Sequence, residues 1–136
     1  MRFSLLRVFI VVGVALFIVS CKKETTKPVL WPSTSFAGSF AGNESCALTG
    51  SGANNIAITA ASATQVSIYN LYGSGRSFNG VVSHDTCTIL PQVYNSGGGN
   101  ALMQGQLVLT SDTLTLNIII SAFSSENTCH AVLVKQ

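Results

Sequence analysis

Charged residues are scarce in this 136-residue chain, because Asp, Glu, Lys and Arg together make up only 9% of it. Ordinary soluble domains carry about 25%. Beyond residue 35 only Arg76 and Lys135 are basic, against four acidic residues, which gives this part a formal charge of −2. Binding to nucleic-acid phosphates needs a basic stripe, and this part has none. We therefore expect no nucleic-acid partner.

Long hydrophobic runs are also missing, with one exception near the N-terminus. Mean hydropathy is +0.45, and much of it comes from the uncharged apolar run Val8–Val19, which follows Arg2 and Arg7. A run of this length fits the roughly 7–15-residue core of an export signal. It is shorter than the ~20 residues that a membrane-spanning helix needs. The sequence predicts a cleaved signal peptide over residues 1–20.

The four residues that end this run, Ile18–Cys21, read Ile-Val-Ser-Cys and resemble the lipobox of bacterial lipoproteins. In that motif the cysteine thiol accepts a diacylglyceryl group, and a small residue before it, here Ser20, admits the signal peptidase. The resemblance implies that Cys21 becomes the lipidated N-terminus of the mature protein. Two or more acyl chains anchor a protein stably to a membrane. An Asp directly after the lipidated cysteine resembles an inner-membrane retention signal, and this chain has Lys22 there. The outer membrane is therefore the expected location, with the protein facing either the periplasm or the cell surface.

Proline, hydroxyl residues and charges fill the stretch after Cys21, and this composition is typical of a flexible linker. We therefore expect a lipidated cysteine and tether over residues 21–35, and a single domain over residues 36–136. From Phe36 onward apolar residues recur with a period of two, as in Thr113–Ile118, and no sustained helical stripe is present.

Short runs of strand-forming residues recur at the spacing of sandwiches and barrels, which predicts an all-β domain with about eight strands. The short connections favour an antiparallel meander that closes into a small barrel by pairing its first strand with its last. A two-sheet β-sandwich is the alternative. The glycine-, serine- and asparagine-rich segments, including Gly50–Asn54 and Ser124–Asn127, are interpreted as connections, with Glu44, Asp85, Asp112 and Glu126 in or near turns.

Three cysteines remain once Cys21 is assigned to lipid, in a compartment that oxidises thiols. We expect a disulfide between Cys46 and Cys129, because these residues lie in the first and last strand regions, which become neighbours when the meander closes. Cys87 is then a buried free thiol. The alternative is that no bond forms and all three cysteines are small core residues.

The sequence around the two histidines contains ligand types that zinc uses, in His84–Cys87 and in Cys129-His130. Adjacent strand residues point to opposite faces, and no spacing matches a zinc site, so we expect no metal. The glycine-rich stretches lack a phosphate-loop lysine, and no Gly-x-Ser-x-Gly elbow occurs. We expect no cofactor and no enzymatic activity; the alternative is an envelope hydrolase that uses His84 or His130.

Lipobox, tether and a roughly 100-residue strand meander together resemble small Gram-negative lipoproteins with a lipocalin-like β-barrel. The segments Val66–Leu71 and Thr88–Gln92 look similar to recurring parts of that group. The resemblance implies a non-enzymatic binding or structural module in the cell envelope, whose partner is another envelope protein or a small apolar ligand. A hollow interior would favour the ligand, and a filled interior would favour a protein partner.

Four aromatic side chains are candidates for the mouth of a ligand site. They are Tyr69, Tyr72, Phe78 and Tyr94. The alternative interpretation is that they are ordinary sheet residues.

Overall fold

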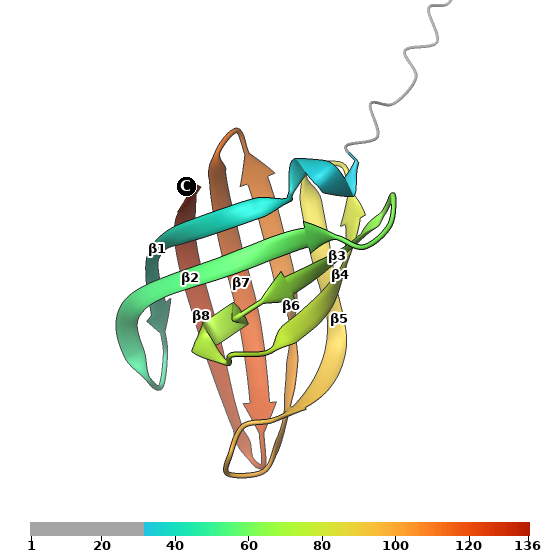
Figure 1. Ribbon diagram of the computed structural model, residues 1–136. Coiled ribbons are helices and arrows are strands. Elements are labelled where there is room, and N and C mark those ends of the chain that lie inside the picture. The colour runs from blue at the N-terminus through green and yellow to red at the C-terminus, as the bar shows by residue number, and fades with distance from the viewer. Residues whose placement is uncertain (1–31) are drawn as a thin grey trace, which may run out of the picture.

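Eight strands make up almost all of the computed structural model, which describes residues 32–136 (Figure 1). Buried and exposed residues alternate along most of their length. The strands are β1 (Gly38–Cys46), β2 (Gly50–Ala60), β3 (Gln65–Tyr69), β4 (Ser77–Ser83), β5 (Thr86–Asn95), β6 (Asn100–Thr110), β7 (Thr113–Ala122) and β8 (Ser125–Lys135). Each pairs antiparallel with the next, and β1 pairs with β8, so the eight strands form a closed barrel. The predicted meander barrel is confirmed, and the two-sheet alternative is excluded. The predicted signal peptide and Cys21 lie outside the described residues.

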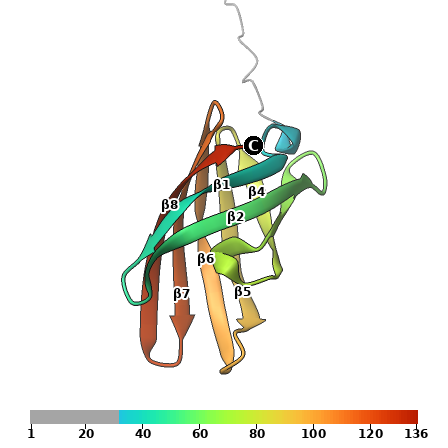
Figure 2. The same ribbon diagram turned by 60° about the vertical axis from the view of Figure 1, so that its left-hand side comes forward.

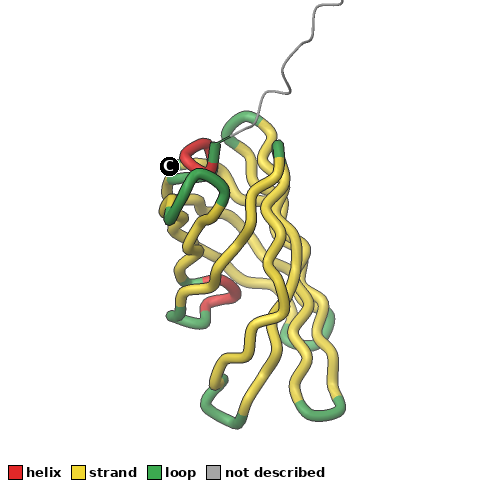
Figure 3. The backbone as a smooth tube through the Cα atoms, turned by 90° about the vertical axis from the view of Figure 1, so that its right-hand side faces the viewer, coloured by secondary structure: helices red, strands yellow, loops and turns green. Residues whose placement is uncertain are grey.

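The two ends of the barrel differ in how they are covered (Figures 1 and 2). The upper end of Figure 1 carries the short helix η1 (Ser33–Ser35), whose Ser33 amide donates to the Ala63 carbonyl at 3.1 Å. Phe36 follows it and is completely buried. The lower end carries η2 (Leu71–Gly73) and the β1–β2, β5–β6 and β7–β8 turns, which Figure 3 shows extending to different depths.

Two segments expected to be connections belong to strands. Gly50–Asn54 forms the first half of β2 and pairs with residues 42–46 of β1. Ser125–Asn127 begins β8 and pairs with residues 120–122 of β7. The glycine and serine content misled the prediction, because pairing with an existing neighbour strand outweighs the weak strand propensity of these residues.

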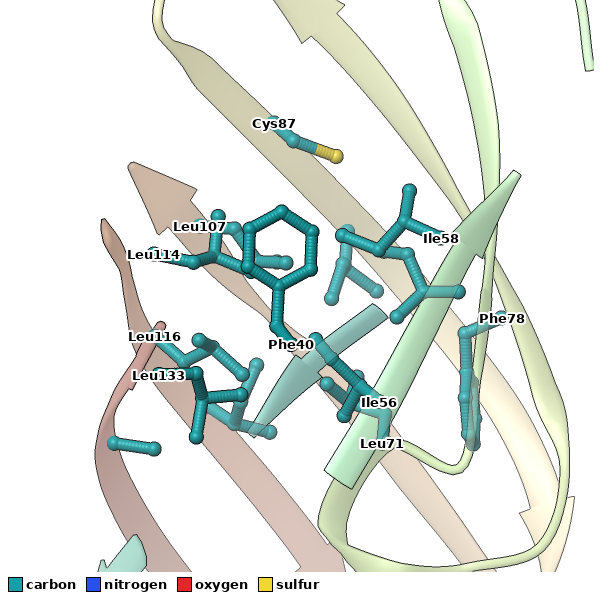
Figure 4. Close-up of a cluster of buried hydrophobic side chains, with 14 of the residues drawn as sticks. Phe40, Ile56, Ile58, Leu71, Phe78, Cys87, Leu107, Leu114, Leu116 and Leu133 are labelled. Atoms are coloured by element: carbon teal, nitrogen blue, oxygen red, sulfur yellow. The ribbon is translucent and has the colours of Figure 1, made fainter. Parts of the chain in front are cut away.

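The barrel interior is filled by side chains from all eight strands (Figure 4). Large residues with less than 2% exposure meet there, and the figure shows Phe40, Leu107, Leu114 and Leu133 pointing toward a common centre. Burial of such side chains is the main favourable term in folding, about 1.5–3 kcal/mol for each large apolar residue. The interior is a packed core.

Three inward-facing glycines, Gly42, Gly80 and Gly105, allow neighbouring strands to approach closely. A Cβ atom on Gly42 of β1 would collide with the Val132 carbonyl oxygen of β8, and one on Gly80 of β4 would collide with the Cys87 sulfur of β5. Glycines at such positions are common where a small barrel bends. They let the sheet close around a narrow core.

The seam between the first and last strands is closed along its whole length. Seven residue pairs join β1 to β8, from Phe40 with Lys135 to Cys46 with Cys129. The last pair is also a disulfide that spans 83 residues of sequence, as predicted. Cys87 is a buried free thiol, also as predicted. Burial raises the pKa of the Cys87 thiol to about 11, so it is a poor nucleophile at neutral pH.

Candidate functional site

The pairing between β4 and β5 is short compared with the strands that make it. Three pairs join them, from Val81 with Thr88 to Ser83 with Thr86, although β5 continues to Asn95. Below these pairs the two strands diverge toward the lower end, as Figures 1 and 2 show. The barrel is therefore closed in topology but opened at this place in its wall.

The divergence coincides with a bulge in β5. Its register with β6 shifts between Ile89 and Gln92, so Leu90 and Pro91 together oppose a single residue of β6. Proline lacks the N–H that a strand ladder needs and is confined to edges and bulges of sheets. Pro91 was the available sequence signal for this opening, and the strand prediction did not use it.

The Gln92 side chain spans the upper limit of the opening. Its Oε1 accepts a hydrogen bond from the backbone amide of Asn79 at 2.9 Å, and its Nε2 donates to the backbone carbonyl of Asn79 at 2.7 Å. The same Nε2 lies 3.2 Å from the Leu90 carbonyl. One side chain thus replaces a main-chain ladder pair between β4 and β5.

Below Gln92 no residue pair joins the facing edges of β4 and β5 within residues 32–136. Backbone groups of successive strand residues alternate in direction, and the bonds at Asn79 show that odd-numbered residues of β4 face β5. The Ser77 amide and carbonyl therefore face the opening. On β5, Gln92 pairs with β6, which turns the backbone groups of Val93 and Asn95 toward it.

The opening is a cleft with a volume of about 540 Å³. It is lined by Gly75, Arg76, Ser77, Phe78, Gln92, Val93, Tyr94 and Asn95. At its base the rings of Phe78 and Tyr94 meet edge to face, with centroids 5.4 Å apart. Burial raises the pKa of the Tyr94 hydroxyl, and nearby Tyr72 adds to the rise, so Tyr94 is a neutral donor at physiological pH.

The loop that carries Arg76 to the rim is held by Asn70. Asn70 adopts a left-handed conformation with φ 62°, which asparagine tolerates better than most residues. Its Nδ2 donates to the Asn55 carbonyl at 2.8 Å, and its Oδ1 accepts from the Gly75 amide at 2.9 Å. The Asn70 side chain therefore holds the loop at the rim of the cleft by one bond within the loop and one bond to β2.

The predicted aromatic candidates separate into different environments. Phe78 and Tyr94 line the cleft, whereas Tyr69 lies half-exposed outside it. The Tyr72 hydroxyl accepts from Asn127 Nδ2 at 3.0 Å and lies 3.0 Å from Thr49 Oγ1. These bonds tie η2 to the β1–β2 turn and to the beginning of β8.

Glu44 was expected near a turn but faces inward on β1. Burial raises the pKa of its carboxyl, and a 2.7 Å hydrogen bond from Asn54 Nδ2 partly offsets this effect. The other amide atom, Asn54 Oδ1, is buried and has no donor among the described residues. This polar pair is an exception within an apolar core.

Both histidines lie on the outside of the barrel. His84 is in the β4–β5 turn with its Nδ1 3.3 Å from Ser83 Oγ, and Cys87 of the same segment points inward. His130 lies on β8 opposite Ser45, while neighbouring Cys129 is in the disulfide. Within residues 32–136 no three metal-ligating side chains come together, and no helix is long and apolar enough to cross a membrane.

No protein-family model matches the sequence, and no curated protein matches it. Two solved structures of β-barrels are similar in fold. A redesigned β-barrel, b11L5F_LGL, has a TM-score of 0.58 at 16% identity, covering 79% of this chain and 97% of its own. EF1p2_mFAP2b bound to DFHBI has a TM-score of 0.58 at 15% identity, covering 77% of this chain and 97% of its own. At this identity the likeness shows the fold alone.

Proposed function

We propose that this protein is a non-enzymatic binding module, held at the outer membrane by lipid on Cys21, that binds its partner in the cleft between β4 and β5. The observation that carries the binding role is the opening in the barrel wall, where unpaired backbone edges, Arg76 and the Phe78–Tyr94 pair face one cleft. The lining of this cleft is mostly polar, which favours a partner recognised through directed hydrogen bonds and charge.

The packed interior favours a surface site over an interior one. Phe40, Leu107 and Leu133 fill the centre of the barrel, where a lipocalin-like ligand would otherwise sit. The similar structure EF1p2_mFAP2b was solved bound to DFHBI, which supports a binding role for a chain of this fold. The filled core directs that role here to the wall and favours a protein partner.

Site-specific photocrosslinking in cells tests the location of the site. A benzophenone amino acid at Val93, which is 67% exposed beside the cleft, is compared with the same group at Val132, which is 47% exposed on β8. The proposal expects a discrete adduct from position 93 and none from position 132. Absence of an adduct at 93, or the same adduct from both positions, would contradict the cleft as the binding site.

The lipid anchor is tested separately by mass analysis of the protein from cells. Cys21→Ala removes the thiol that accepts diacylglycerol, so the variant is expected to accumulate as an unprocessed precursor with residues 1–20 attached. A free Cys21 thiol in the native protein would contradict the proposed lipid anchor. So would a Cys21→Ala variant that is cleaved normally and stays at the membrane. The crosslinking result does not depend on this outcome.

A further inference from the structure

The cleft exposes strand edges of the kind that pair with another chain. Along β5 the backbone groups of Val93 and Asn95 face the opening, two residues apart, which is the spacing at which an edge strand offers successive hydrogen-bonding pairs. Across the opening the Ser77 amide and carbonyl face the same space. Unpaired N–H and C=O groups in this arrangement form a template for strand addition.

The charge of the cleft is positive and uncompensated. Arg76 contributes the only charged side chain to its lining. From residue 36 onward the other basic residue is Lys135, on β8 at the opposite seam of the barrel. A ligand with a carboxylate near Arg76 would gain a charge-assisted hydrogen bond.

From these two observations we infer that the cleft binds an extended peptide segment, which adds as a strand to the Val93–Asn95 edge of β5 and places an acidic group beside Arg76. The inference deepens the proposed function and rests on it, since it assumes that the cleft is the binding site. In strand addition the main-chain hydrogen bonds give affinity and side-chain contacts give specificity. Here Tyr94, whose ring rests on the buried Phe78, and the exposed Arg76 supply those contacts.

A second copy of this chain fits the edge less well than an acidic peptide does. A symmetric contact joins the same surface patch of both copies, so both Arg76 guanidiniums would come to one interface. The cleft lining contains no carboxylate to compensate them. Like charges brought together oppose association.

The test selects ligands for the full-length protein in detergent from a random ten-residue peptide library displayed on phage. Selected peptides are then measured against Val93→Pro and Val93→Thr. Proline removes the amide that strand addition uses, and that amide faces the opening and not β6, so the fold is expected to persist. Threonine keeps the amide and alters the side chain, so it is the matched control.

We expect Val93→Pro to weaken peptide binding about tenfold, the effect of losing one directed hydrogen bond and its neighbours, and Val93→Thr to change it little. Should Val93→Pro fail to fold, peptides N-methylated at alternate amides provide the same test from the ligand side. Peptide binding is also expected to slow hydrogen exchange at the Ser77, Val93 and Asn95 amides.

The charge requirement is measured with Arg76→Gln and the matched neutralisation Lys135→Gln. We expect selected peptides to be rich in Asp or Glu, and Arg76→Gln to weaken their binding about fivefold while Lys135→Gln has little effect. The inference is wrong if no peptide is enriched, if N-methylation or proline leaves binding unchanged, or if the full chain dimerises through this edge. A crosslink at Val93 together with any of these results would leave the proposed function standing.

Discussion

The two seams on opposite sides of the barrel are built in opposite ways. β1 and β8, from the two ends of the domain, are joined by seven residue pairs and a disulfide. β4 and β5, which are consecutive, are joined by three pairs and then separate. A tight hairpin costs little loop entropy and pairs most readily, whereas bringing distant strands together costs more. The barrel therefore has a covalent bond at the β1–β8 seam, where pairing costs more loop entropy, and an opening at the β4–β5 seam, where pairing costs less.

This contrast identifies the opening as a built feature of the wall. The Pro91 bulge interrupts β5, and Gln92 fixes the point at which the strands separate. Bulges next to functional sites re-aim side chains and end pairing. A seam that opened only because its turn was weak would need neither the Pro91 bulge nor the Gln92 side-chain bridge. The predictions that follow test each seam in turn.

Removal of the disulfide is expected to have the largest effect on stability. The bond closes a loop of 83 residues, and loop-entropy reasoning assigns such a loop about 4–5 kcal/mol, with about 2–5 kcal/mol typical for native disulfides. We expect the double variant Cys46→Ser and Cys129→Ser to lose stability in this range in urea unfolding of the full chain.

Reductant provides the internal control for the disulfide. It is expected to lower the stability of the native protein to that of the double variant and to leave the variant unchanged. If the double variant unfolds at the same urea concentration as the native protein, the noncovalent pairs of the β1–β8 seam are sufficient and the covalent account is wrong.

Alanine at Gly42 and at Gly80, close-approach glycines of the closed and the open seam, is expected to distinguish the two seams. At Gly42 the new Cβ meets the Val132 backbone carbonyl, which cannot move without displacing β8, whereas at Gly80 it meets the Cys87 side-chain sulfur. We expect Gly42→Ala to cost about 2–3 kcal/mol and Gly80→Ala about 1 kcal/mol. Thermal unfolding of both variants measures the difference.

A second substitution sharpens this result at the open seam. Cys87→Ala removes the sulfur that obstructs Gly80→Ala, so the double variant is expected to be more stable than the sum of the two single changes, with a coupling of about 1 kcal/mol. Strict additivity would show that the strands part when residue 80 gains a methyl group, and that the contact between Gly80 and Cys87 does not hold the seam.

Loss of the Gln92 bridge is expected to extend the opening upward. Gln92→Leu removes both hydrogen bonds to the Asn79 backbone, at a cost of about 1 kcal/mol because these groups are exposed and can bond to water. The direct measure is faster hydrogen exchange at the Asn79 amide. The Gln92→Glu side chain still accepts a hydrogen bond from that amide but cannot donate to the carbonyl. In this variant the Asn79 amide is therefore expected to exchange faster than in the native protein and more slowly than in Gln92→Leu.

Sequence patterns predicted the closed seam better than the open one. Period-two alternation and short connections indicated a meander, and the positions of Cys46 and Cys129 in its first and last strand regions indicated which strands meet. These inferences use properties that a closed barrel imposes on every strand. The predicted pairing of the cysteines is confirmed because ring closure leaves those two strands adjacent.

Phe78 and Tyr94 were among the predicted aromatic candidates. The place of the cleft in the barrel wall was not predicted, because it depends on side chains that act against the pattern. Gln92 looks like an ordinary polar strand residue, and only the structure shows that it bonds to the Asn79 backbone across the gap. Glu44 was expected in or near a turn, whereas it lies on β1 and faces inward beside Asn54. Single polar side chains that replace main-chain pairs leave no periodic signal.

Neutralisation of Glu44, which lies on β1 at the closed seam, is expected to have the smallest effect on stability. Burial raises the pKa of Glu44 in the folded protein. As pH rises through the ordinary carboxyl value of about 4.3, the unfolded chain loses its proton first. The folded state then binds more protons, so stability falls with pH until the folded-state pKa is passed. Glu44→Gln removes this loss.

The amide of Glu44→Gln also supplies a donor for Asn54 Oδ1, which is buried without one among the described residues. We expect a gain of less than about 1 kcal/mol at neutral pH. The gain is expected to vanish near pH 3, because the protonated Glu44 carboxyl offers the same acceptor and donor as the Gln amide. Urea unfolding at the two pH values measures this, with the exposed Glu126→Gln as control. An equal gain at both pH values would show that the amide donor, and not the charge, sets the stability of this seam.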